Sequence, residues 1–104
     1  MEIIILAPAF RDLERFRVFM QERDMSEERI SHILNCVLDS IENLKGNPRL
    51  GFSIGVRYGY TTPYRGYITD PYIVVYEILG DFVEIRRIYH LREDYIRDIL
   101  VIEP

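Results

Sequence analysis

PYIVVYEILGDFVEIRRIYHLRED, residues 71–94, contains the clearest structural pattern in the chain. Two runs rich in β-branched and aromatic residues, 72–79 and 82–90, are separated by the turn dipeptide Gly80-Asp81, and this arrangement predicts a β-hairpin. The second run and its end carry the densest group of basic and imidazole side chains: Arg86, Arg87, His90 and Arg92. We therefore expect this hairpin to carry both the sheet and any functional site.

The second strand of this hairpin needs a β-bulge. Val83 and Ile85 fall on one face, but strict alternation would put Ile88 on the opposite face. A bulge near Arg86-Arg87 returns Ile88 to the apolar face and turns the arginines in a new direction.

The residues before the hairpin predict the rest of the sheet. Residues 52–69 are rich in glycine and tyrosine and predict a strand near 53–58, an exposed turn over 59–63 and a strand near 65–69. At the N-terminus, the β-branched run Glu2 to Ala7 predicts a strand that is buried on both faces.

The segments outside the predicted strands show the periodicity of helices. The first helix is expected to start near Pro8 and to continue through Arg23, with an apolar face of Phe10, Leu13, Phe16 and Met20. The second is expected to start at the cap Ser26 and to end at Gly46. Its apolar stripe comprises Ile30, Ile33, Leu34, Val37, Leu38, Ile41 and Leu44. A last helix is predicted over 92–101, with the apolar edge Ile96, Ile99 and Leu100.

This order predicts the α+β class in one domain, residues 1–104. We expect an N-terminal strand, a two-helix antiparallel hairpin, a three- to four-stranded mostly antiparallel sheet and a short C-terminal helix. A chain of 104 residues is large enough for one core. The single cysteine, Cys36, cannot form an internal disulfide, which favours a reducing, cytoplasmic location. The five apolar residues before Pro8 are too few for a signal peptide or a membrane span.

The charge balance excludes a general nucleic-acid binder. Thirteen basic and seventeen acidic residues give a net charge of −4, and the isoelectric point is about 5.1, whereas such binders usually lie above ~9. Twelve of the thirteen cations are arginine, which leaves local sites for carboxylate or phosphate open.

Several ordered motifs resemble the RelE/ParE toxin superfamily, the toxic half of bacterial type II toxin–antitoxin pairs. The motifs are Ala7-Pro8-Ala9-Phe10-Arg11-Asp12-Leu13, similar to the family's Ala-x-x-Asp-Leu; Leu44 to Gly51, similar to Leu-x-x-Asn-Pro-x-x-Gly; Arg65; Tyr72-x-x-x-Tyr76; Gly80-Asp81; and Ile85-x-x-Ile88-x-His90-x-Arg92. The resemblance implies a growth-arresting toxin with a cognate antitoxin as partner. RelE-like members cut messenger RNA on the ribosome, and ParE-like members poison DNA gyrase.

The helix–helix–Asn-Pro-x-x-Gly section looks closer to the ParE branch. Three positions depart from the family pattern by losing positive charge: Ile73, Glu77 and Glu93. Because affinity for a polyanion falls steeply with each lost phosphate contact, these departures favour a protein target, DNA gyrase, over the ribosome and messenger RNA. A third alternative is a non-toxic homologue that only binds an antitoxin.

The RNase alternative assigns specific roles. His90 would be the acid or base, with Arg65 and Arg86 stabilising the charged phosphate. Phosphate or target binding would fall to a wider set: Arg87, Arg92, Tyr60, Tyr64, Tyr89 and Tyr95. In the structural alternative, His90 makes a strand-end hydrogen bond and the arginines pair with Glu77, Glu84 and Glu93. No metal or cofactor is expected, because the two histidines have no Cys or carboxylate at ligand spacing.

A partner is also indicated by the first helix. Phe16 and Phe19 lie on adjacent faces of it, so that one ring is expected to remain uncovered until a partner helix or strand buries it. We accordingly expect the free protein either to form homo-oligomers or to be poorly soluble.

Overall fold

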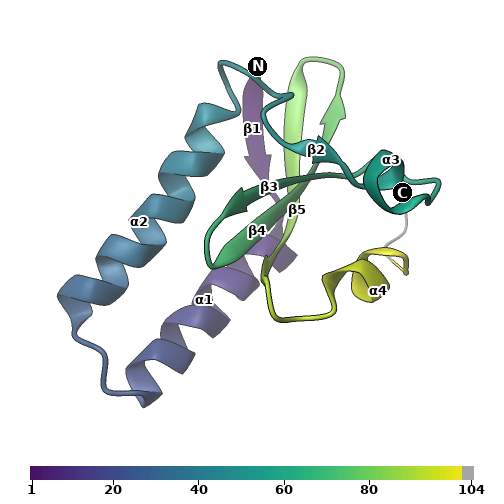
Figure 1. Ribbon diagram of the computed structural model, residues 1–104. Helices are drawn as coiled ribbons and strands as arrows, with labels where there is room; N and C mark the ends of the chain where they lie inside the picture. The colour runs from purple at the N-terminus through teal and green to yellow at the C-terminus, as the bar shows by residue number, and fades with distance from the viewer. Residues whose placement is uncertain (102–104) are drawn as a thin grey trace.

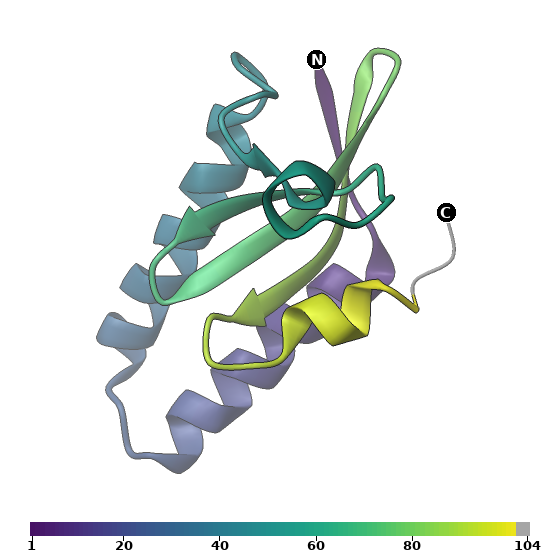
Figure 2. The same ribbon diagram turned by 45° about the vertical axis from the view of Figure 1, so that its right-hand side comes forward.

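The computed structural model describes residues 1–101 as an open five-stranded sheet with helices on both faces (Figures 1 and 2). The elements in chain order are β1 (Glu2–Ile5), α1 (Ala7–Glu22), α2 (Glu27–Asn43), β2 (Phe52–Ser53), α3 (Ile54–Tyr58), β3 (Arg65–Thr69), β4 (Tyr72–Leu79), β5 (Phe82–His90) and α4 (Tyr95–Ile99). The strand order is β1-β5-β4-β3-β2, in which only the β1–β5 pair is parallel. The α+β layout is therefore confirmed, and β1 together with the short β2 brings the sheet to five strands.

Each face of the sheet has its own apolar cluster. The larger cluster lies under α1 and α2, and its fully buried members include Ala9, Ile30, Leu44, Val74, Tyr76, Val83, Ile85 and Ile88. The second lies under α3 and α4 and contains Ile54, Tyr64, Ile73, Val75, Tyr89 and Ile99. Central strand β4 contributes to both, because successive side chains of a strand point to opposite faces. The long helices and the short helices thus sandwich the sheet.

The hairpin matches its sequence pattern. The structure gives β3, β4 and β5 the predicted bounds, and Gly80 takes a left-handed conformation (φ 59°) in the turn. The predicted bulge is confirmed: Val75 pairs with Arg87 and Tyr76 with Ile85, so that Arg86 has no partner residue on β4. Ile88 consequently joins the larger apolar cluster.

The predicted cap of α2 is confirmed, and the predicted end is wrong. The Ser26 hydroxyl accepts a hydrogen bond from the Arg29 amide at 3.2 Å. The helix ends at Asn43, before Gly46, and Leu38 is 40% exposed at the edge of the apolar stripe. Phe10 is also misplaced by the prediction, since it is 55% exposed. It lies roughly 100° around α1 from Ala9, which is fully buried.

Three further predictions are wrong at element boundaries. The N-terminal strand is not buried on both faces: β1 is an edge strand on which Glu2 and Ile4 are exposed. The predicted strand over 53–58 is mostly helix α3. The Ser53 hydroxyl caps this helix by accepting from the Val56 amide, and Gly59 ends it at φ 78°. The C-terminal helix is shorter than predicted because the Asp94 side chain caps it three residues before Arg97.

The hydroxyl of Tyr76 helps to fasten the 47–51 loop to the sheet. Tyr76 donates to the Pro48 carbonyl at 2.6 Å and accepts from the Gly51 amide at 3.0 Å. A Cβ at Gly51 would lie 2.5 Å from the Gly66 carbonyl oxygen and 2.7 Å from the Tyr76 hydroxyl, so only glycine fits. The motif Asn-Pro-x-x-Gly and the tyrosine of β4 are therefore one structural unit.

No helix within residues 1–101 combines the length and the apolar composition needed to cross a membrane.

Candidate functional site

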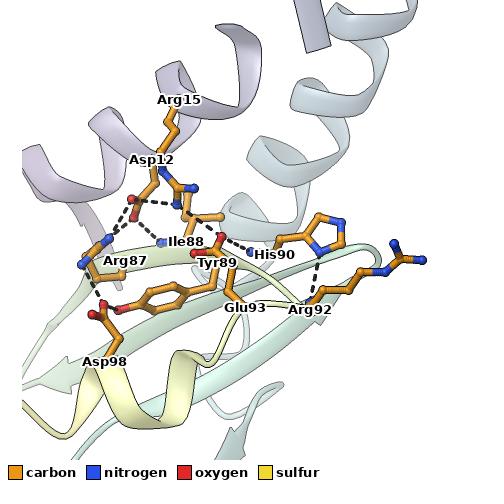
Figure 3. A network of polar contacts seen from close by, with 9 residues as sticks. All are labelled: Asp12, Arg15, Arg87, Ile88, Tyr89, His90, Arg92, Glu93 and Asp98. Atoms are coloured by element: carbon orange, nitrogen blue, oxygen red, sulfur yellow. Dashed lines mark hydrogen bonds and ion pairs between the residues drawn. The ribbon is translucent and has the colours of Figure 1, made fainter. Parts of the chain in front are cut away.

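A buried carboxylate on α1 holds the cationic strand in place (Figure 3). Asp12 is 3% exposed and accepts from Arg87 at both oxygens, from Nε at 2.8 Å and from Nη2 at 2.9 Å. It also accepts from the backbone amide of Ile88 at 2.8 Å. Because the ion pair has two hydrogen bonds, Asp12 fixes both the position and the orientation of the Arg87 guanidinium.

The other side of Arg87 is tied to the C-terminal helix. Its Nη1 donates to Asp98 at 3.0 Å, and the Tyr89 hydroxyl donates to the same carboxylate oxygen at 2.5 Å. The hydrogen bond to Asp12 raises the pKa of Arg87. Burial, followed by the bond to Asp98, raises the pKa of Tyr89 well above its usual value. Both side chains therefore keep their protons at neutral pH.

The positive charge of the bulged residue Arg86 is also compensated by carboxylates. Its Nη2 lies 3.3 Å from Glu77 and 3.3 Å from Glu84, and its guanidinium carbon is 5.8 Å from the Tyr64 ring centre. Two adjacent arginines of β5 thus face different surroundings, and each has carboxylate partners within the chain.

His90 ends β5 in a hydrogen-bonded turn beside α1. Its backbone amide donates to Glu93 at 3.0 Å, and its Nδ1 accepts from the Arg92 amide at 3.1 Å. Arg15 of α1 donates to the same Glu93 oxygen at 3.3 Å. The imidazole ring lies edge-on to Tyr72, with ring centres 5.7 Å apart. In Figure 3 the Arg92 side chain extends away from this network.

The structure does not bring the three residues of the RNase alternative together. Arg65 donates to the Gly51 carbonyl at 2.5 Å and so faces the 47–51 loop. Its β4 partner and that of His90 are four residues apart, roughly 13 Å along the strand. Arg86 points to the other face of the sheet, where Glu77 lies.

The four candidate tyrosines differ in access. Tyr64 is 2% and Tyr89 is 1% exposed, so that their rings belong to the second apolar cluster. Tyr95 packs near them with its hydroxyl 3.1 Å from that of Tyr58, and burial followed by this bond raises the pKa of Tyr95 to about 12. Tyr60 is 45% exposed and offers an open ring.

Sequence reasoning missed the carboxylates that bind Arg87. Asp12 carried a signal, because it lies between Ala9 and Phe16 on the buried face of α1, where an unpaired carboxylate is very unfavourable. Asp98 carried none, since it is half-exposed on the C-terminal helix and its partners, Arg87 and Tyr89, are on β5. Within residues 1–101 no three His, Cys, Asp or Glu side chains are grouped as metal ligands would be.

Comparison with known proteins identifies a family and a shared fold. Residues 3–95 match the profile of the family described as ParE toxin of type II toxin-antitoxin system, parDE. Among solved structures, a chain of the chromosomal ParDE TA system from P. aeruginosa superimposes with a TM-score of 0.71 at 15% identity. The superposition covers 86% of this chain and 95% of that chain. No curated protein sequence matches the chain.

Proposed function

The chain belongs to the ParE toxin family of type II toxin–antitoxin systems, and we propose that it arrests growth by binding DNA gyrase until a cognate antitoxin neutralises it. The family membership spans nearly the whole described chain. The fold shared with a chain of a ParDE system supports the same assignment.

The observation that carries the choice of a protein target is the charge compensation of β5. Arg86 is paired with Glu77 and Glu84, and Arg87 is paired with Asp12 and Asp98. A phosphate group would have to displace a carboxylate that already binds either arginine. Cations that are already neutralised contribute little to the binding of a polyanion.

The separation of Arg65, Arg86 and His90 points the same way. Phosphoryl chemistry at a ribose hydroxyl needs an acid, a base and cations around one phosphate. Here the three side chains contact a loop, a pair of glutamates and a turn, respectively. We therefore favour binding over turnover, with messenger RNA cleavage on the ribosome as the competing outcome.

Exposed apolar surface supports an antitoxin partner and self-association of the free chain. Phe19 is 53% exposed on α1, whereas Phe16 is buried beneath it at 6%. Both rings line a hollow of about 320 Å³ between α1 and the end of β5, and exposed apolar surface of this kind is typical of a protein-binding site. Light scattering of the purified chain should show species larger than a monomer, and a stable monomer at high concentration would argue against self-association.

Induced expression in bacteria tests the proposal. We expect growth arrest with chromosomal DNA breaks that require gyrase, relieved by co-expression of the antitoxin from the neighbouring open reading frame. Mapping messenger RNA 5′ ends in the same cells provides the competing readout: codon-linked cleavage without DNA breaks would establish the RNase instead. If growth is unimpaired, the remaining alternative is a non-toxic homologue that only binds an antitoxin.

A further inference from the structure

One side of α1 carries a stripe of basic and aromatic residues at four-residue spacing. Its members are Arg11, Arg15, Phe19 and Arg23, and all four are exposed. Residues four apart are neighbours on a helix, so these side chains form a continuous row. The Arg23 guanidinium lies over the Phe19 ring, 4.6 Å from its centre. The row is distinct from the apolar face of α1 that packs on the sheet.

Two adjoining hollows run along this row, between α1 and the end of β5. One, of about 320 Å³, is lined by Arg15, Phe16, Phe19, His90 and Glu93. The other, of about 400 Å³, is lined by Pro8, Arg11, Asp12, Arg15 and Arg87. They meet at Arg15, and together we name them the α1–β5 groove. Phe16 and Phe19 give its first hollow an apolar floor.

The carboxylates of the groove already have partners. Asp12 is bound by Arg87, and Glu93 accepts from Arg15 and from the backbone of His90. By contrast, Arg11 and Arg23 form no ion pair within residues 1–101 and are exposed along the row. A locally basic surface therefore occurs on a chain with a net charge of −4.

The histidine at the groove also presents a donor. Because the His90 Nδ1 accepts from the Arg92 amide, the neutral ring carries its proton on Nε2. Donors from His90 and from the unpaired Arg11 and Arg23 thus border an apolar floor. Carboxylates are the natural complement of such a rim.

We propose that the α1–β5 groove binds an acidic segment of a partner protein, one large apolar side chain of which fills the hollow against Phe16 and Phe19. A protein segment fits better than a polynucleotide, because the floor of the groove is apolar. The proposal rests on the proposed function only in identifying that partner as the antitoxin.

A matched pair of peptides tests the chemistry. Two fluorescent 12-residue peptides carry the same central leucine and phenylalanine, flanked by Asp and Glu in one and by Lys in the other. Fluorescence anisotropy on the full chain at low salt should show the acidic peptide binding at least about tenfold tighter, and added salt should reduce the difference. Equal binding, or tighter binding of the basic peptide, would overturn the proposal.

Variants locate the binding. Phe19→Ala should weaken the acidic peptide about tenfold or more, whereas Phe10→Ala, an equally exposed ring on another side of α1, should not. Arg11→Glu and Arg23→Glu should each weaken it and flatten the salt dependence. Lys45→Glu, the same charge change at the end of α2, should have no effect. Thermal unfolding of every variant checks that the fold is intact. If Phe10→Ala and Phe19→Ala weaken peptide binding equally, the groove is not the binding site and the proposal is wrong.

A 12-nucleotide single-stranded RNA serves as competitor. If it displaces the acidic peptide more effectively than unlabelled peptide does, the groove is a nucleic-acid site and the proposal is wrong. Growth arrest by the unaltered chain is scored separately. A toxic chain that fails to bind acidic peptides contradicts the groove alone, and a harmless chain that binds them contradicts the toxin assignment alone.

Discussion

Arg87 and Asp12 lie 75 residues apart in the chain and form a two-pronged ion pair with hydrogen bonds of 2.8 and 2.9 Å. The same carboxylate accepts from the Ile88 amide, so that α1 is joined to β5 just beyond its bulge. The pair both fastens the long helix to the sheet and uses up a cation that would otherwise be available to a ligand.

Removing the buried carboxylate should destabilise the protein severely. Asp12→Ala leaves the Arg87 guanidinium and the Ile88 amide without their partner, and we expect a loss of about 3–5 kcal/mol in the free energy of unfolding. Asp12→Asn, which keeps the shape and one acceptor, should lose less. Urea unfolding measures both. Glu14→Ala, on the exposed side of α1, should change stability by less than about 0.5 kcal/mol. An Asp12→Ala loss below about 1 kcal/mol would show that the pair is not structurally important.

The hydroxyl of Tyr76 should have a large effect for a single atom. Tyr76→Phe leaves the Gly51 amide and the Pro48 carbonyl without this partner, and we expect a loss of about 1–3 kcal/mol. Tyr67→Phe is the control, because the Tyr67 hydroxyl makes no hydrogen bond within the described residues. Equal stabilities of the two variants in urea unfolding would contradict the anchoring role. Hydrogen exchange at Gly51 should also accelerate in Tyr76→Phe only.

Alkaline pH should destabilise the fold through Tyr89. Its pKa is raised in the folded state by burial and by Asp98, whereas in the unfolded chain it lies near ~10. The contribution of Tyr89 to the free energy of unfolding is therefore fully present below pH ~10. Above that pH it is lost at about 1.4 kcal/mol per pH unit. Tyr95, with a pKa of about 12, acts in the same direction. Urea unfolding between pH 8 and 11 should show a fall that Tyr89→Phe reduces and Tyr60→Phe does not. A profile that is identical in Tyr89→Phe would contradict this origin.

The local patterns of the chain were readable from sequence, and the long-range ones were not. The alternation around Gly80-Asp81 was enough to place β4, β5 and the bulge at Arg86, because each depends on residues close in the chain. Helix α3 was missed although its signals, the cap Ser53 and the αL Gly59, were present. A five-residue helix has too little periodicity to compete with a β-branched run.

The candidate site was less predictable because its geometry depends on pairing across the fold. Glu77 and Glu84, which bind Arg86, were among the three glutamates that the sequence offered as partners for the arginines. The partners of Arg87 come from α1 and α4 instead, and nothing near Arg87 in the sequence indicates them. Likewise, the row formed by Arg11, Arg15, Phe19 and Arg23 becomes one side of a groove only because the turn after β5 lies beside it.

His90 should be dispensable for toxicity. Its Nδ1 is engaged by the Arg92 amide, and the proposed catalytic arginines lie elsewhere. His90→Ala is expected to arrest growth at an induction level within about threefold of the unaltered chain. His32→Ala is the matched control, because it changes the other histidine, an exposed residue of α2. Loss of toxicity in a folded His90→Ala protein, with His32→Ala unaffected, would support acid–base catalysis.

The most direct measurement is a gyrase assay with the purified chain. DNA gyrase, relaxed plasmid and ATP are incubated with increasing amounts of the protein, and supercoiling and covalently trapped DNA breaks are scored on gels. We expect inhibition of supercoiling with accumulation of gyrase-linked breaks, reversed by the antitoxin, and no cleavage of messenger RNA on purified ribosomes. Unaffected gyrase together with ribosome-dependent cutting of messenger RNA would contradict the account.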